Sequence, residues 1–192
     1  SNILMSEISV IDLKMDGLKL LTRDNHLDAR GSFHKLFSSF HLDEVWNHSI
    51  KQINLSQTMQ KGTVRGMHMQ LSPETEAKIV TCLKGKIFDV ALDLRQHSDT
   101  FLQWHAEELS EENLSSLLIP AGFAHGFQAL SDNTEILYVH SHNYVKEKEF
   151  GIHHLDKTLK IDWPLQITTC SDKDKKLPQF SKQLIEEMND EM

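Results

Sequence analysis

The feature that most constrains this chain is a series of eight short segments rich in Val, Ile, Leu, Phe and Thr, separated by turn-like stretches. With little helical pattern between them, they predict an all-β antiparallel sandwich or barrel. We find no repeat, low-complexity stretch or linker, so a single domain over 1–192 is expected. The predicted strands are 50–57, 63–70, 77–83, 86–94, 101–107, 115–119, 126–130 and 134–140.

Local signals add detail to this all-β prediction. Gly85, in the sequence Leu-Lys-Gly-Lys, indicates a tight β-hairpin between two of the strands. A short helix is expected at 41–46, and a helical turn at 110–114 with Ser110 as its cap. The acidic, helix-prone segment 184–188 is interpreted as a solvated terminal helix.

Composition and charge limit the possible functions. The chain has 192 residues, of which 39% are hydrophobic, and a formal charge of −8. This charge disfavours a nucleic-acid-binding protein, and no apolar run is long enough to span a membrane. The N-terminus shows no basic stretch followed by an apolar one. Cys82 and Cys170 lack metal-site spacing, and reduced thiols are favoured over a disulfide. A cytoplasmic protein is predicted.

Two segments alternate in a way that has two interpretations. Over 86–94, one face carries Phe88 and Val90 and the other carries Asp89 and Asp93. Over 134–142, Tyr138 shares a face with Ile136, His140 and His142. The polar faces either meet solvent or line a wet cavity inside a barrel. Periodicity alone does not separate these alternatives.

Two clusters contain candidate site residues. In the first, Arg65 precedes His68 by three positions, which places them on opposite faces of a regular strand; a bulge at Gly66 would bring them to one site. The second, Pro-x-Gly-x-x-His ending at His125, resembles the second motif of cupin barrels. Metal-binding cupins pair it with His-x-His, whereas this chain has His68-Met-Gln. No metal site is therefore predicted.

Taken in order, the motifs resemble the dTDP-4-dehydrorhamnose 3,5-epimerase family, and the resemblance covers residues 28–178. It rests on segments that begin with Asp-Ala-Arg-Gly-Ser-Phe at 28–33 and include Gln-Ile-Asn at 52–54. The remaining segments are 65–70, 77–80, 85–95, 109–110, 119–127, 137–138, 144, 161–164 and 171–174. The resemblance implies a cupin-like double-stranded β-helix (jelly-roll) barrel with a few short helices. It also implies a homodimer that works without metal or cofactor.

The resemblance further implies epimerisation at C3 and C5 of a nucleotide-linked 4-keto-6-deoxyhexose. The C4 carbonyl acidifies both positions, so the chemistry needs a base, an acid and a group that stabilises the enolate. By resemblance, His68 is the base, Asp174 orients it, Tyr138 is the acid on the opposite face, and Lys78 stabilises the enolate oxygen.

The same resemblance implies a set of substrate contacts. Tyr144 would stack on the nucleobase, and Arg30 would reach a diphosphate, from the neighbouring subunit if the dimer exchanges N-terminal strands. His125 and Asp89 would support the pocket. The complete set of implied contacts is Arg30, Gln52, Asn54, Arg65, Asp89, His125, Tyr144, Glu149 and Lys173.

The chain also departs from the family pattern. Lys35 stands where many members carry an acidic residue, Met69 replaces a common aromatic, and His154 replaces a Trp. These departures concern the nucleotide and the sugar rather than the proton-transfer groups. The alternatives are a 3-only or 5-only epimerase on another nucleotide sugar, a related ketoisomerase, a metal-dependent cupin dioxygenase and a non-catalytic sugar-binding cupin.

Overall fold

The computed structural model describes residues 7–190, so the interpretation of the extreme N-terminus lies mostly outside the described residues. The helical elements are α1 (Ser39–Leu42), the 3₁₀ turn η1 (Lys146–Lys148), α2 (Asp172–Lys175) and α3 (Lys182–Asp190). The strands are β1 (Ile8–Asp12), β2 (Lys19–Arg23), β3 (His26–Asp28), β4 (Gly31–Phe33), β5 (Gln52–Thr58), β6 (Val64–Gln70), β7 (Lys78–Lys84), β8 (Lys86–Asp93), β9 (Trp104–Ser110), β10 (Ser116–Ile119), β11 (Phe123–Ala129), β12 (Thr134–His140) and β13 (Glu149–Gly151).

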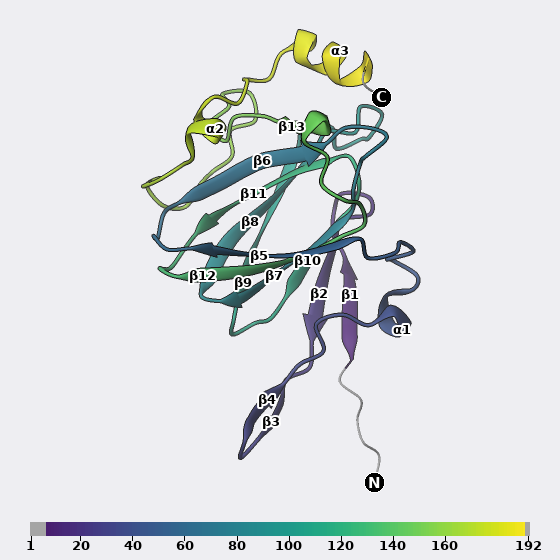
Figure 1. Cartoon of the computed structure of the whole chain (residues 1–192), viewed down its shortest axis with the longest axis vertical. Helices are drawn as coiled ribbons and strands as arrows, with labels where there is room; N and C mark the ends of the chain where they lie inside the picture. Colours follow the sequence, from purple (N-terminus) through teal and green to yellow (C-terminus); the bar gives the residue numbers. More distant parts are fainter. Residues whose placement is uncertain (1–6, 191–192) are drawn as a thin grey trace.

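Two antiparallel sheets face each other and form the cupin-like barrel (Figure 1). The first has the order β1-β2-β10-β7-β12-β5, and the second has the order β13-β6-β11-β8-β9. A separate two-stranded hairpin, β3–β4, projects from the body of the molecule. The predicted all-β architecture is confirmed, and all eight predicted strands are present, seven of them with shifted ends.

The space between the sheets holds the main core and, next to it, a cavity. Val80 and Ile136 from the first sheet pack with Ile87, Ala91 and Phe127 from the second. Because strand residues alternate between faces, this core fixes which face of each strand looks inward.

The inward faces include the polar residues whose placement the sequence left open. On β8, Asp89 and Asp93 are fully buried, while Val90 and Leu92 pack on the outer side of the sheet. On β12, Ile136, Tyr138 and His140 face inward. The interpretation that polar faces line a cavity is therefore correct for Tyr138, whereas Asp89 is buried behind the cavity wall, and the solvent-facing alternative is wrong for both.

Three local predictions are corrected. The turn at Gly85 is not a hairpin, because β7 pairs with β10 and β12 while β8 pairs with β9 and β11. The chain crosses there from one sheet to the other. The helix predicted at 41–46 begins at Ser39, because the Ser38 side chain caps it, and ends at Leu42. The terminal helix α3 is not fully solvated, because Leu184 and Met188 are buried.

The C-terminal segment covers the outer face of the five-stranded sheet. Ile152, Leu159 and Ile161 pack against Val90 and Leu92 in a second apolar cluster. This segment leads into α2, and α2 contacts β6 (Figure 1). Packing of the tail thus brings residues near 174 to the edge of the barrel. No helix within residues 7–190 is long and apolar enough to cross a membrane.

Candidate active site

A cavity of about 840 Å³ opens between the two sheets and adjoins the main core at Phe127 and Tyr138. One wall comes from β5, β7 and β12, the other from β6 and β11, and residues 169–174 close the side. Of the residues predicted from the sequence, those that line it are Asn54, Arg65, His68, Lys78, His125, Tyr138, Lys173 and Asp174. The four predicted catalytic residues therefore meet in one cavity.

A bulge in β6 brings Arg65 and His68 to this cavity, as the glycine between them predicted. His68 pairs with His125 and Arg65 pairs with Phe127, so three steps on β6 oppose two on β11. Gly66 has a φ of +128°, and a Cβ there would lie 2.6 Å from the Cα of Gly126. A side chain at this position is therefore excluded by both backbone conformation and space.

His68 forms a short hydrogen bond with Asp174. The distance from His68 Nε2 to Asp174 Oδ1 is 2.5 Å, and Asp174 Oδ2 accepts the Gly66 N–H at 3.0 Å. Burial alone would raise the pKa of Asp174, but the hydrogen bonds and positive potential from His68 and the Gly66 N–H lower it below its usual value. The His68 side chain keeps 35% exposure, against 5% for Asp174, so the imidazole faces the cavity.

A second His–carboxylate pair lies deeper. His125 Nε2 is 2.6 Å from Asp89 Oδ1, and both side chains are buried. Burial lowers the pKa of His125 below its ordinary value, although Asp89 acts in the opposite direction. Asp89 Oδ2 has no hydrogen-bond partner in the described chain. Asp89 does not line the cavity itself and acts behind His125.

Tyr138 stands on the opposite wall from His68. Its hydroxyl lies 3.0 Å from the Ser56 hydroxyl, and its ring meets the His125 ring edge-on with centroids 6.2 Å apart. Burial raises the pKa of Tyr138 to about 12, and the hydrogen bond from Ser56 only partly offsets this. The phenol is therefore protonated at neutral pH.

Lys78 supplies a buried positive charge on the same wall as Tyr138. It is only 7% exposed, and burial lowers the pKa of its ammonium group. Glu76, 3.9 Å away, and Asp89 act in the opposite direction and stabilise the charged form. The positive charge of Lys78 would stabilise an anion that forms in the cavity.

A polar network connects the rim of the cavity. Gln52 Nε2 donates to Asn54 Oδ1 at 3.1 Å, and the Tyr144 N–H donates to Gln52 Oε1 at 3.1 Å. The Tyr144 hydroxyl donates to Glu149 at 2.9 Å, and Lys173 donates to the same carboxylate. Tyr144 itself is 54% exposed. The predicted contacts Gln52, Tyr144 and Glu149 thus lie beside the cavity lining rather than in it.

The two predicted arginines differ in placement. Arg65 lies at the cavity and is fixed by Thr58 Oγ1 at 3.0 Å and by the Gln57 carbonyl at 2.9 Å. Arg30 lies on the projecting β3–β4 hairpin, where its exposed side chain pairs with Asp28. Within one chain, Arg30 is not brought to the cavity.

Comparison with known proteins decides the family. The family model described as dTDP-4-dehydrorhamnose 3,5-epimerase matches residues 12–182. The chain belongs to the dTDP-4-dehydrorhamnose 3,5-epimerase family. A relative of that name from Shigella flexneri is 43% identical over 149 residues, which is 77% of this chain and 82% of the relative.

Solved structures agree with this family assignment. An epimerase from Legionella pneumophila, in complex with dTDP-4-keto-L-rhamnose, matches with a TM-score of 0.86 and 38% identity over 93% of this chain and 97% of that chain. A 3′-monoepimerase from Streptomyces bikiniensis, in complex with dTDP-quinovose, matches with a TM-score of 0.82 and 26% identity over 93% and 97%.

Three functional candidates on this epimerase fold were not predicted to have a role. Ser56 contacts the Tyr138 hydroxyl, and Glu76 contacts both Lys78 and His140. The alternation of β12 placed His140 on the face of Tyr138, which was the available signal. No such sequence signal was present for Ser56 or Glu76, because each contacts its partners only once distant strands have paired.

The structure also shows where one departure from the family pattern, Met69, and the two thiols lie. Met69 packs in the outer apolar cluster, so it points away from the cavity. Buried Cys82 and Cys170 are free, as predicted. Among residues 7–190, no group of three or more His, Cys, Asp or Glu side chains is arranged to hold a metal ion.

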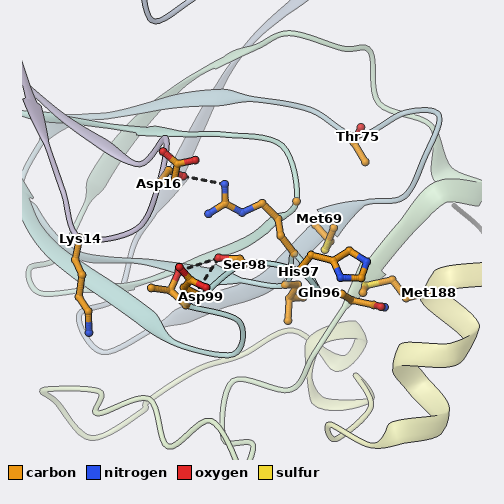
Figure 2. A pocket seen from close by; sticks show the side chains of 13 residues that line it. Lys14, Asp16, Met69, Thr75, Gln96, His97, Ser98, Asp99 and Met188 are labelled. Carbon is orange, nitrogen blue, oxygen red and sulfur yellow. Dashed lines mark hydrogen bonds between the residues drawn. The ribbon is translucent and has the colours of Figure 1, made fainter.

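A second hollow of about 600 Å³ lies near α3 and contains different chemistry (Figure 2). Arg95 lines it and donates to the Asp16 carbonyl at 2.8 Å and to the Asp93 carboxylate at 3.0 Å. Met69 and Met188 supply apolar lining. None of the predicted site residues lines this hollow, so the larger cavity is the candidate active site.

Proposed function

We propose that this chain converts dTDP-4-dehydro-6-deoxy-D-glucose to dTDP-4-dehydro-L-rhamnose by epimerisation at C3 and C5. The observation that carries the proposal is the placement of His68 and Tyr138 on opposite walls of one cavity, with Lys78 beside Tyr138. Inversion at carbon requires removal of a proton on one face and its return on the other. The family relationship supports this reaction.

His68 is the base in this proposal. The Asp174 carboxylate accepts the hydrogen on His68 Nε2, which leaves the Nδ1 lone pair to take the proton from C3 or C5. As the imidazole becomes charged, Asp174 stabilises it. Asp174 is therefore a positioning residue that also raises the basicity of His68.

Tyr138 and Lys78 complete the proton transfer. Because burial keeps the phenol protonated, with a pKa of about 12, Tyr138 donates a proton to the carbon from the face opposite His68. The Lys78 ammonium stabilises the enolate oxygen formed at C4, an arrangement that lowers the barrier most when the charge is held in a dry site. The proposed reaction uses these side chains without a metal or organic cofactor.

The remaining predicted residues hold the substrate. Arg65, Asn54 and His125 face the sugar and its phosphate, with Asp89 behind His125. Tyr144 stacks on the nucleobase, and Glu149 and Lys173 fix the orientation of its ring. The net charge of −8 is thus compatible with an anionic substrate, because the cations gather locally.

We propose a homodimer in which Arg30 reaches the diphosphate bound by the neighbouring subunit. Support comes from the β3–β4 hairpin, which projects from the body and exposes Leu27 and Phe33 at 72% and 67%. In a mixed dimer, an Arg30→Ala chain and a His68→Asn chain form one site with both native residues. Mixing and refolding the two inactive variants should restore activity, and no restoration would contradict the shared site.

The buried free thiols Cys82 and Cys170 support a reducing compartment, and we place the protein in the cytoplasm. Thiol titration of protein extracted from its native cells under acid quench would test this, with two free thiols expected.

Product analysis tests the reaction itself. With the 4-keto sugar as substrate, NMR of the reduced product should show inversion at both C3 and C5. Inversion at one centre alone would establish the single-position alternative, which the similarity to the 3′-monoepimerase makes the closest competitor. Binding without inversion at either centre would leave a sugar-binding cupin and overturn the proposal.

A further inference from the structure

A directed chain of hydrogen bonds runs from the cavity wall to the Tyr144 segment through His140. His140 Nδ1 lies 3.1 Å from Glu76 Oε2, and His140 Nε2 lies 3.3 Å from Asn54 Nδ2. From Asn54 the chain continues through Gln52 to the Tyr144 N–H, with 3.1 Å at each step. Five groups from three separate parts of the sequence are thereby linked in series.

Chemistry fixes the direction of every bond in this chain. An ionised carboxylate only accepts, so His140 donates its Nδ1 hydrogen to Glu76, and a neutral imidazole then keeps a lone pair on Nε2. Asn54 must then present its NH₂ group to His140 and its carbonyl oxygen to Gln52. Gln52 in turn presents its carbonyl oxygen to the Tyr144 N–H. The Glu76 carboxylate at one end and the Tyr144 N–H at the other therefore require the same orientation of the Asn54 and Gln52 amides.

Burial makes Glu76 and His140 the fixed end of the chain. Their side chains are 11% and 12% exposed, whereas Asn54 and Tyr144 are exposed at the rim. Lys78 Nζ stands 3.9 Å from Glu76, and the His140 ring stacks on Tyr138 with centroids 6.0 Å apart. Glu76 and His140 are thus held by Lys78 and Tyr138, which lie on the cavity wall formed by β7 and β12. The exposed end of the hydrogen-bond chain carries Tyr144, the residue proposed to stack on the nucleobase.

We propose that Glu76 and His140 are positioning residues that orient the Asn54 and Gln52 amides and so hold the Tyr144 segment in place for the nucleotide. This inference rests on the proposed function for its kinetic consequences only. In this proposal His140 acts on the substrate through Asn54, Gln52 and Tyr144, so its loss should weaken substrate binding more than proton transfer.

Two replacements of His140 separate the hydrogen bonds from the ring. His140→Phe keeps an aromatic ring next to Tyr138 but makes neither hydrogen bond. His140→Gln retains a donor for Glu76 and an acceptor for Asn54. His142→Phe is the matched control, because His142 lies on the same segment and contacts Ser141 rather than this chain.

Hydrogen exchange at the Tyr144 amide, measured by NMR without substrate, tests the chain directly. A protecting hydrogen bond that is lost or weakened raises the exchange rate. We expect exchange to become about tenfold faster in His140→Phe, to return toward the wild-type rate in His140→Gln, and to stay at that rate in His142→Phe, as a loss of about 1.4 kcal/mol would give. Unchanged exchange in a folded His140→Phe protein, verified by its amide spectrum, would overturn the proposal.

Steady-state kinetics provide the second readout. In His140→Phe, KM should rise about tenfold while kcat stays within about twofold of wild type, with partial recovery of KM in His140→Gln. A fall in kcat with unchanged KM would assign His140 to proton transfer through Tyr138 and contradict a positioning role. If the wild-type protein turns over no 4-keto sugar, the function proposal fails, whereas the amide-exchange result still decides the hydrogen-bond chain.

Discussion

The two His–carboxylate pairs of the cavity contain the same groups in opposite environments. His68–Asp174 is open to the cavity, with the imidazole 35% exposed, whereas His125–Asp89 is buried, at 6% and 0%. A base must reach its substrate and must exchange protons during turnover. The greater exposure of His68 supports its proposed assignment as the base, with His125 as the supporting residue.

The origin of the difference lies in the elements that carry the carboxylates. Asp174 comes from α2, a short helix capped by Ser171 and brought to the barrel by the C-terminal segment. Asp89 comes from β8, an interior strand of the five-stranded sheet that lies between β11 and β9. Asp174, supplied by a helix outside the sheets, leaves His68 at the cavity surface. Asp89, supplied by the sheet itself, holds His125 in the cavity wall.

Replacement of His68 should give the largest effect. His68→Asn removes the base, and epimerisation should fall by at least about 10³-fold, within the range known for general base catalysis. His125→Asn, which keeps every residue of the proton path, should lose about tenfold or less. Initial rates of product formation measure both. Equal losses in the two variants would remove the distinction between the pairs.

Replacement of Asp174 should give the next largest effect. Asp174→Asn loses the charge that stabilises the imidazolium and, with its single amide oxygen on the Gly66 N–H, presents its NH₂ group to His68, so kcat should fall about 10²-fold. The Gly66 N–H can still bond to the amide oxygen, so the fold should be retained, as thermal unfolding would show. A kcat near the wild-type value would contradict the orienting role of Asp174.

Replacement of Asp89 should reduce stability more than replacement of Asp174 does. Asp89→Asn weakens a buried charge-assisted hydrogen bond to His125, and the free energy of unfolding should fall by about 1–3 kcal/mol. Denaturant unfolding of Asp89→Asn and Asp174→Asn in parallel makes the comparison. A larger loss in Asp174→Asn would reverse the assignment of the buried pair as the structural one.

The smallest expected effect is a change in pH dependence. Burial lowers the pKa of His125 in the folded protein below the value of 6.5 expected when unfolded. As pH falls through 6.5, the unfolded chain binds more protons, so this residue makes stability decrease toward acid pH and increase toward neutral pH. Its contribution to the slope is at most about 1.4 kcal/mol per pH unit. In His125→Asn the slope between pH 7.5 and 5.5 should be shallower; an unchanged slope would contradict a buried neutral imidazole.

The sequence predicted much of this arrangement, and for different reasons in different places. Local alternation located the eight strands, and Gly66 indicated the bulge that unites Arg65 with His68. The resemblance located His68, Lys78, Tyr138 and Asp174, which the structure brings into one cavity although they are far apart in sequence.

Other features depend on pairing between distant segments. Gly85 carries the local signature of a hairpin, but its flanking strands pair in different sheets, which no local pattern records. Glu76 lies in a loop and gains significance only where β12 brings His140 to it. Arg30 lies on a projecting hairpin, so its proposed role depends on a second chain.

Solvent deuterium uptake tests the central claim most directly. In D₂O with dTDP-4-dehydro-6-deoxy-D-glucose, NMR should show deuterium at both C3 and C5 with the wild-type protein and with His125→Asn, and at neither position with His68→Asn. Exchange that persists in His68→Asn, or that is absent from the wild-type protein, would contradict the assignment of the exposed histidine as the base.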